Sequence, residues 1–375
     1  MEGQKRKEKK KKGRRMLTML LVVAAGLFLG GKIVGGECLA AAAPGAPQGV
    51  MAVGVKDQVV LSWEKVNGAD GYEIYERKKG GVWSAVRVTA AGKTVLKNRE
   101  NGERYQYKVR AYQTRKTGMK YGKFSQKSDT TLPERGTSTL RNLLKTAMAP
   151  VGSTMYIWGG GWNKADNGAG ADGLRIGLNP RWRAFAQKQK SSYAHKKYAY
   201  KRGYGLDCSG FVGWTVYNSF HTKKGKPGEG YVRKAKTMAE TFAKKGWGTY
   251  KKASAVRDYR PGDIMSGPGH VYIVIGECED GSVVLVHSSP AGVQISGTVS
   301  PAGKKDSDAV RLARKSMKKY YPSWYKKFPN VERNLSYLRQ YSQFRWNTGK
   351  GSLMEDPDDY KEKTAKEVLR DLFSF

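Results

Sequence analysis

Alternation of apolar and polar positions characterises the first folded stretch of the chain, from residue 44 to about residue 133. Five short segments in this stretch are rich in β-branched and aromatic residues, and Asn-Gly and Gly-Gly pairs mark turns between them. The pattern predicts an all-β sandwich over residues 44–133. The expected strands are Val59–Trp63, Tyr72–Arg77, Val82–Val88, Tyr105–Tyr112 and Lys123–Thr131.

The pattern changes to helical spacing after a polar linker. Apolar residues that recur every three or four positions predict a helix starting near Ser138. A buried helix of about three turns should follow Cys208, where the chain is apolar on most sides. Farther on, His270–Gly276 and Ser282–His287 flank an Asp-Gly pair, which predicts an antiparallel hairpin.

Two other regions are less regular. Residues 161–205 are rich in Gly, Asn, Lys and Tyr with weak periodicity, and we expect a long surface insertion there. Residues 301–375 predict a helical extension packed on the preceding domain, with one helix ending at Pro322 and the last starting at Asp356. We expect the aromatic residues of this extension to be core rather than a ligand platform.

The N-terminus, residues 1–43, has the three regions of an export signal. Residues 1–15 carry nine Lys or Arg and two Glu, and an apolar run and a small-residue stretch follow. The run is only slightly short for a membrane span, so a cleaved signal and an uncleaved anchor both fit. We therefore expect a protein that is secreted or associated with the cell wall.

The charge indicates anionic partners, because 69 Lys and Arg stand against 32 Asp and Glu, a net charge of +37. The cations are spread along the chain with no basic helix, zinc-finger spacing or RNP-like string. Nucleic acid, acidic lipid and wall polyanions all fit the charge alone. With an export signal we expect anionic cell-wall polymers and no nucleic acid, membrane contact only through the N-terminal segment, and a monomer.

Two cysteines, Cys208 and Cys278, remain if the signal is removed, so the chain is not a disulfide scaffold. A single disulfide between these two cysteines is compatible with the sequence. No CxxC or HxxxH spacing occurs, and we expect no metal and no other cofactor.

Cys208 is the candidate nucleophile. It precedes the apolar run at a predicted helix start, where unpaired backbone N–H groups and the helix dipole favour a thiolate. His270 and His287 lie downstream on the two predicted strands, a separation typical of a cysteine–histidine pair. A two-residue turn would place His287 about 13 Å along the strand from His270. The two histidines can therefore meet only with a wider loop or a bulge.

The first domain resembles fibronectin type III domains. Trp63 in VVLSWEKV matches the early core tryptophan of that family, and Tyr105 in ERYQYKVRAY matches its corner tyrosine. The domain has no cluster of titratable residues, which favours a spacer or adhesion module, and carbohydrate or wall binding is the alternative.

Residues 139–300 resemble the NlpC/p60 cysteine peptidases. The resemblance rests on Tyr156 in YIWGG, DCSGF at 207–211, RPGDI at 260–264, His270 in GHVYIVIG and His287 in LVHSSPAGVQIS. It implies an α+β papain-like fold and cleavage of peptidoglycan stem peptides in a Gram-positive bacterium, at the bond between D-γ-glutamyl and the diamino acid. The alternatives are an amidase or acyltransferase on the same fold, and a non-catalytic wall-binding or adhesion protein.

The resemblance also implies roles for individual residues. Cys208 would be the nucleophile, His270 its general base, and His287 the group that orients His270 and stabilises its imidazolium. Tyr156 and the backbone N–H of Cys208 would stabilise the oxyanion. The implied substrate-binding residues are Asp207, Ser209 and Trp158.

One feature departs from compact relatives, in which the YxxGG phrase lies close before DCSG. Here 46 residues separate Gly160 from Asp207. We therefore expect the insertion at 161–205 to shape or cover the cleft, and the role of Tyr156 depends on how the insertion folds. His195, within the insertion, is expected to be a surface residue.

Overall fold

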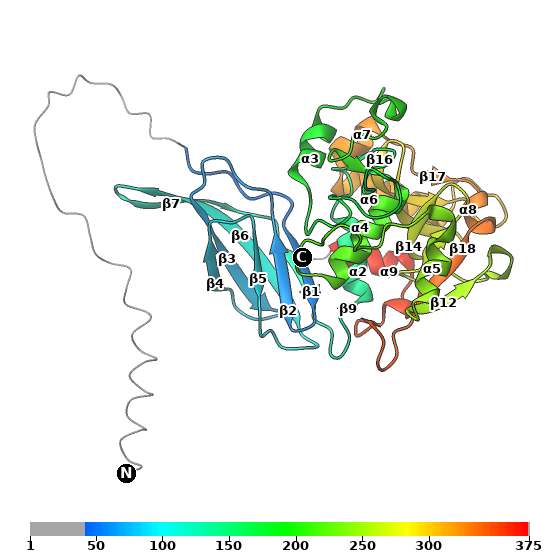
Figure 1. Cartoon of the computed structure of the whole chain (residues 1–375), viewed down its shortest axis with the longest axis horizontal. Coiled ribbons are helices and arrows are strands. Elements are labelled where there is room, and N and C mark those ends of the chain that lie inside the picture. Colours follow the sequence, from blue (N-terminus) through cyan, green and yellow to red (C-terminus); the bar gives the residue numbers. More distant parts are fainter. Residues whose placement is uncertain (1–41, 374–375) are drawn as a thin grey trace, which may run out of the picture. The chain divides into compact units, whose positions relative to one another are not determined.

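Two antiparallel sheets make up the first folded part of the computed structural model, which describes residues 42–373 (Figure 1). One sheet has the order β1-β2-β5; the other has the order β4-β3-β6-β7, with β8 also paired to β6. The strands are β1 (Met51–Val55), β2 (Gln58–Ser62), β3 (Gly71–Lys78), β4 (Ser84–Thr89), β5 (Lys93–Leu96), β6 (Arg104–Arg115), β7 (Gly118–Phe124) and β8 (Ser128–Thr131).

Side chains from both sheets share one core, so this part is a sandwich. Trp63 packs edge to face on Tyr72, with ring centroids 5.3 Å apart. The hydroxyl of Tyr105 accepts a hydrogen bond from the backbone N–H of Glu100 at 3.1 Å, the arrangement of a tyrosine corner. The predicted all-β sandwich, and the positions of Trp63 and Tyr105 in it, are confirmed.

Strands β1 and β5 are absent from the sequence prediction, and the strand expected at Lys123–Thr131 is two strands, β7 and β8. Strand β1 does not alternate because both of its faces are buried. Ala52 belongs to the sandwich core, whereas Met51, Val53 and Val55 belong to the core of the second part of the chain. A strand buried on both faces has a continuous apolar sequence, which periodicity cannot assign.

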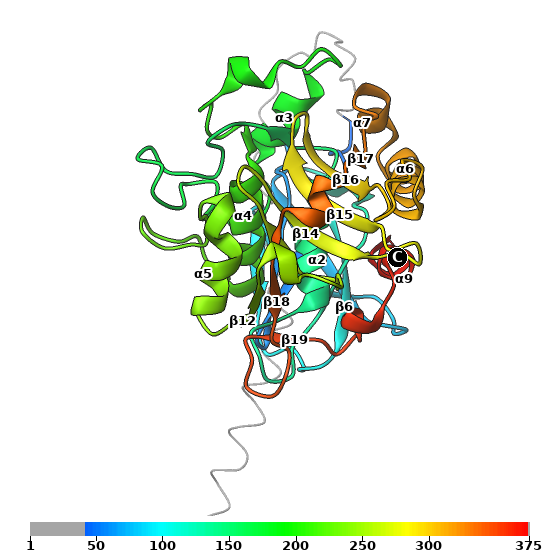
Figure 2. The same cartoon turned by 90° about the vertical axis from the view of Figure 1, so that its right-hand side faces the viewer.

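A nine-stranded sheet organises the second part (Figure 2). Its order is β11-β10-β16-β15-β14-β13-β18-β12, and β17 pairs with β16. The strands are β10 (Met155–Tyr156), β11 (Gly205–Leu206), β12 (Gly248–Lys251), β13 (Ile264–Ser266), β14 (Val271–Glu277), β15 (Val283–Ser289), β16 (Gly292–Thr298), β17 (Glu332–Arg333) and β18 (Ser342–Trp346). A further short pair joins β9 (Ser138–Thr139) to β19 (Met354–Glu355).

Most of the helices share a large core on one face of this sheet, whereas α8 (Ser336–Arg339) packs on the other face. Val271, Ile273 and Ile275 of β14 point into the large core that the helices share, whereas Tyr272 and Val274 point to a smaller aromatic cluster on the other face. The helices are α2 (Leu140–Met148), α3 (Pro180–Gln187), α4 (Cys208–Phe220), α5 (Met238–Lys244), α6 (Asp308–Tyr320), α7 (Pro322–Lys327), α8 (Ser336–Arg339) and α9 (Ala365–Phe373).

The two helices predicted around the candidate site form where the sequence places their caps. The side chain of Thr139 accepts from the backbone N–H of Asn142 at 3.1 Å, so α2 starts two residues after Ser138. Helix α4 starts at Cys208 and has 13 residues, close to the predicted three turns.

Two regions differ from the sequence prediction. The insertion at 161–205 is not only a surface loop, because Trp182 of α3 is buried in the large core. The extension at 301–375 is not purely helical, since β18 lies between β13 and β12 in the central sheet. The last helix starts at Ala365 rather than Asp356, whose carboxylate instead accepts backbone N–H groups of Tyr360 and Lys361 in a short turn.

An ionic network joins the sandwich to the second part, and we call it the junction: Arg104, Asp129, Arg141, Lys145 and Asp371. Arg141 is fully buried and binds both Asp129 and Asp371. Arg104 binds the same two carboxylates at 2.8 and 2.9 Å. Lys145 lies 2.6 Å from Asp129. Each buried charge of the junction therefore lies beside a charge of opposite sign.

The predicted export signal falls on residues 1–43, of which the structure describes only the last two. Within residues 42–373, no helix is long and apolar enough to cross a membrane.

Candidate active site

Cys208 is the first residue of α4, next to the start of β14. Its thiol is almost entirely buried, with 6% of the residue exposed. Burial and the neighbouring Asp207 carboxylate raise the pKa of the Cys208 thiol to about 12, although the backbone N–H of Val271 acts in the opposite direction. The resting side chain is thus a thiol and not a thiolate.

His270 and His287 are in direct contact. Nε2 of His270 lies 2.8 Å from Nδ1 of His287, and the rings meet edge to face. Two features set this register: the loop is wider than two residues, with the Cys278 N–H donating to the Ser282 carbonyl, and a shift of one residue follows between Val274 and Gly276. Together they place His287 near the start of β14 rather than midway along it. The predicted bulge is confirmed.

The histidine pair and the thiol are neighbours in the chain topology. His270 lies between Gly269, which lines the same hollow as Cys208, and Val271, whose N–H faces the thiol. Among residues 42–373, no hydrogen bond joins the thiol to His270 itself. Such bonds are often long in unliganded enzymes and shorten when substrate binds.

Arg333 of β17 approaches the far side of His287. Its Nε–H donates to Nε2 of His287 at 3.2 Å, where the hydroxyl of Ser296 also lies 3.1 Å away. Burial and Arg333 lower the pKa of His270 to about 3, and the same two causes hold the pKa of His287 well below its ordinary value. Both imidazoles are therefore neutral at physiological pH.

Tyr156 lies beside the cysteine despite the 46-residue gap. Strand β10 pairs in parallel with β11, which places Tyr156 opposite Leu206, two residues before Cys208. The insertion between them returns to support this residue: the hydroxyl of Tyr193 donates to the Tyr156 carbonyl at 2.7 Å. Burial, with Cys208 and Asp207 nearby, raises the pKa of Tyr156, so its hydroxyl stays a hydrogen-bond donor.

His195 is half-buried, and the expectation of a surface residue is wrong in part. Its ring packs edge to face on Tyr156, with centroids 5.8 Å apart. Residues 161–205 have too little periodicity for this contact to be predicted. His195 therefore supports the site through Tyr156.

Asp207 and Ser209 are both buried, and their side chains are bonded within the protein. One carboxylate oxygen of Asp207 accepts from the Ser209 hydroxyl at 2.8 Å and from the backbone N–H of Gly210 at 2.6 Å. The other oxygen accepts from Gly159 N–H at 3.1 Å. Burial nevertheless raises the pKa of Asp207 to about 6. Asp207 thus caps α4 and ties it to the YIWGG turn.

A hollow of about 410 Å³ opens over the thiol. Trp158 is half exposed at its rim, and its indole N–H donates to the hydroxyl of Tyr200 from the insertion at 3.2 Å. The lining thus combines aromatic rings with two lysines and two aspartates, Asp166 and Asp207. Its members include Tyr156, Trp158, Trp162, Tyr200, Cys208, Lys234 and Lys236.

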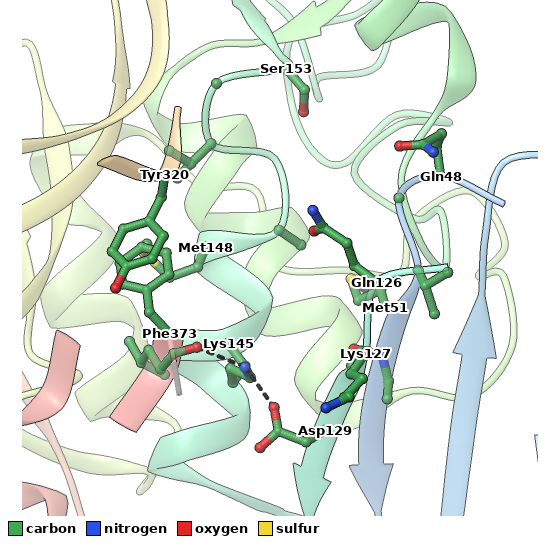
Figure 3. Close-up of a pocket in the computed structure, with 18 of the residues that line it drawn as sticks. Gln48, Met51, Gln126, Lys127, Asp129, Lys145, Met148, Ser153, Tyr320 and Phe373 are labelled. Carbon is green, nitrogen blue, oxygen red and sulfur yellow. Dashed lines mark hydrogen bonds and ion pairs between the residues drawn. The ribbon is translucent and has the colours of Figure 1, made fainter. Parts of the chain in front are cut away.

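A second hollow lies at the junction, between the sandwich and α2 (Figure 3). Lys145 reaches Asp129 on one side and donates to the carbonyl of Leu372 in α9, at 2.8 Å, on the other. Its lining includes neither of the described cysteines and none of the histidines. The hollow over Cys208 is therefore the better candidate for chemistry.

Cys208 and Cys278 are both free, so no disulfide joins them in this structure. Among residues 42–373, no cluster of three His, Cys, Asp or Glu side chains is placed to hold a metal ion. The chemical resources of the site are a thiol, two linked imidazoles and a buried phenol. Such a set can carry out nucleophilic attack with proton transfer.

No family model matches the sequence, and no curated protein is similar to it. Solved structures similar to part of the chain include a Fn3-like protein from Clostridium thermocellum, with 23% sequence identity over 24% of this chain and 96% of that chain and a TM-score of 0.22. FN3tt gives 21% identity over 25% and 98% of the two chains, also with a TM-score of 0.22. A β-1,2-glucanase from Parabacteroides distasonis has 21% sequence identity over 28% of this chain and 15% of that chain, again with a TM-score of 0.22.

These matches cover a minor part of the chain and give no evidence for an NlpC/p60 peptidase domain. The strand order and the tyrosine corner described above make the sandwich fibronectin type III-like. A fold of this kind carries no function by itself.

Arg333 and Tyr337 were missed by sequence reasoning. Arg333 lies in the region expected to be a helical extension, and nothing in its local sequence points to a histidine 46 residues earlier. Tyr337 packs beside both histidines, with ring centroids 5.6 and 6.1 Å away. Only the pairing of β17 with β16 brings this segment to the site.

Proposed function

We propose that the chain is an exported cysteine peptidase with a papain-like catalytic domain, which hydrolyses amide bonds in peptidoglycan stem peptides. The observation that carries the proposal is the hydrogen bond between His270 and His287 at the start of β14. The residue after His270, Val271, directs its backbone N–H toward the Cys208 thiol, so the pair and the thiol lie close together. The sequence phrases around these residues supply the substrate class, with the bond between D-γ-glutamyl and the diamino acid as the proposed target.

In this mechanism Cys208 attacks the amide carbon as His270 removes the thiol proton. Because the thiol pKa is about 12 and that of His270 about 3, attack and proton transfer occur together rather than from a preformed ion pair. The tetrahedral intermediate collapses to a thioester as the imidazolium protonates the leaving amine, and water then hydrolyses the thioester.

The oxyanion is stabilised by two donors. The backbone N–H of Cys208 belongs to the first turn of α4, where N–H groups have no partner within the helix. The Tyr156 hydroxyl, a donor at all physiological pH values, is the second. Trp158, Lys234 and Lys236 line the same hollow and are placed to hold a peptide that carries carboxylates.

The cationic surface supports a location on an anionic cell wall. The net charge of +37 predicts wall binding that weakens with salt, because Coulomb attraction between exposed charges is screened within about 8 Å at physiological ionic strength. Retention on purified walls that does not change between low and high salt would contradict this part of the proposal.

The decisive experiment compares the wild type with Cys208→Ala on purified peptidoglycan. We expect release of new amino groups by the wild type and a loss of at least about 1000-fold in the variant, because no other thiol of residues 42–373 faces the hollow over Cys208. Cys278→Ser, which removes a thiol elsewhere in the domain, is the matched control and should retain activity.

Mass spectrometry of the released muropeptides identifies the bond. Products ending at D-γ-glutamate support the endopeptidase. Products cut between sugar and peptide would replace it with an amidase, and transferred acyl groups would replace it with an acyltransferase. Equal wall binding by wild type and Cys208→Ala, without any product from either, would indicate a binding protein.

A further inference from the structure

The orientation of the Arg333 guanidinium constrains where the protons of the histidine pair lie. An arginine carries its charge at all accessible pH values and its N–H groups can only donate. Since Nε–H of Arg333 points at Nε2 of His287, that nitrogen must accept, and in a neutral imidazole the proton is then on Nδ1. Nδ1 of His287 in turn faces Nε2 of His270 at 2.8 Å.

The same reasoning extends to His270. Its Nε2 accepts the proton of His287 and therefore carries a lone pair, so the proton of neutral His270 is on Nδ1. Nδ1 is the only ring nitrogen left for Cys208. In this arrangement His270 presents an N–H, not a lone pair, on the side from which it would have to deprotonate the thiol.

We propose that Arg333 is a positioning residue that holds the histidine pair in this resting tautomer, and that Ser296 accepts a hydrogen bond from Nε2–H of His287 when the pair changes to the working one. This inference rests on the proposed function, because it concerns the base of that reaction. In the change, Nδ1 of His287 gives its proton to Nε2 of His270, Nδ1 of His270 releases its proton to water, and Nε2 of His287 takes one up from water. In the working tautomer Nε2–H of His270 then donates to Nδ1 of His287, and Nε2–H of His287 donates to the Ser296 hydroxyl, 3.1 Å away. The Arg333–His287 hydrogen bond must break for this to occur, because two N–H groups would otherwise face each other.

The charges around the pair favour the resting form. Arg333 is partly buried, donates from its two terminal nitrogens to the carbonyls of Glu332 and Asn330, and forms no salt bridge with any carboxylate of residues 42–373. The Glu332 carboxylate attracts it only from a longer distance. An uncompensated cation beside an imidazole opposes its protonation.

The other groups that face the pair do not offset this charge. They are the hydroxyls of Ser289 and Ser296, the rings of Tyr337 and Tyr341, and the Cys208 thiol. None of them is an anion at neutral pH in its ordinary state. Removal of the guanidinium should therefore favour both the working tautomer and an imidazolium next to the thiolate.

The test measures the rate at which iodoacetamide alkylates Cys208 in the full-length protein between pH 5 and pH 10, read by mass spectrometry of the Cys208 peptide. In the wild type the rate should rise only toward alkaline pH. In Arg333→Met we expect the midpoint to fall by about one pH unit or more, and the rate near pH 7 to rise about 10-fold. Arg339→Met, which removes an exposed arginine six residues away, should leave the profile unchanged.

Two further variants separate charge from hydrogen bonding. Arg333→Lys keeps the charge and should give a profile closer to that of the wild type, and it also serves if Arg333→Met does not fold. Ser296→Ala in the Arg333→Met background removes the acceptor of the working tautomer and should reverse part of the shift. An unchanged midpoint in Arg333→Met, or the same shift in Arg339→Met, would overturn the proposal.

Alkylation requires no substrate, so this outcome does not depend on peptidase activity. An unchanged profile with full Cys208-dependent hydrolysis would refute the role of Arg333 and leave the proposed function intact. A shifted profile without hydrolysis of peptidoglycan would support the role of Arg333 and refute the proposed function.

Discussion

Arg141 and Arg333 are both withdrawn from solvent, but their surroundings differ. At the junction, Arg141 binds two carboxylates, and those charges raise its pKa. At the candidate site, Arg333 meets an imidazole and two carbonyls, and burial lowers its pKa. The first arrangement stabilises a fold at little electrostatic cost, whereas the second maintains an unmatched charge where protons would have to move.

The largest expected effect is on stability at the junction. Arg141→Met leaves two carboxylates with fewer cations in a buried place, and we expect a loss of about 3 kcal/mol, at the low end for broken buried pairs because Arg104 still binds both carboxylates. Arg333→Met should cost less than about 1 kcal/mol, since no carboxylate loses its partner. Urea denaturation at pH 7 measures both. A similar loss of unfolding free energy in the two variants would contradict the difference drawn between Arg141 and Arg333.

The second effect is acid sensitivity of the junction. Burial raises the pKa of Asp129 and of Asp371 in the folded state, but Lys145, Arg141 and Arg104 at Asp129, and the two arginines at Asp371, lower it, so that the net shift of both pKa values is downward. The stability that these carboxylates contribute is complete above their unfolded pKa of about 4 and is lost as pH falls through the lower folded values. We therefore expect a smaller loss of stability between pH 5 and pH 2 in Arg141→Met than in the wild type. Equal acid losses in denaturation curves would contradict it.

The smallest effect concerns Asp207, where the sign is the opposite. Burial raises the folded pKa of this carboxyl to about 6, so the folded state binds a proton more tightly than the unfolded chain and gains stability as pH falls from about 6 to 4. Asp207→Asn should remove that gain. It should also cost about 1–2 kcal/mol at pH 7, because asparagine still caps the helix but has no acceptor for the Gly159 N–H that the second carboxylate oxygen binds. Ser307→Asn, at the cap of α6, is a matched control whose pH dependence should follow the wild type.

Much of the local structure could be predicted from the sequence, because it depends on neighbouring residues. The caps at Thr139 and Asp207 and the hairpin around Asp280 follow from short-range turn and helix chemistry. The bulge followed from a geometric condition, since two histidines on one hairpin can meet in only a few registers.

The remaining features depend on contacts between distant segments, which periodicity does not record. Strand β1 was missed because a second core covers its other face. Strand β18 is five residues long and gains its place from β13, about 80 residues earlier. Arg333 reaches His287 only because β17 joins the sheet beside β16. Such pairings are tertiary, and a single sequence contains no local sign of them.

The double burial of β1 also limits how the chain can be divided. The strand lends Met51, Val53 and Val55 to the core that encloses α4, so the sandwich supplies part of the wall around the helix that carries Cys208. A fragment cut at the linker near residue 133 would expose an apolar strip on α2 and α4 and would be prone to aggregation. Fibronectin-like modules are often exchanged as independent units, but in this protein a graft of the second part would have to include the first strand of the sandwich.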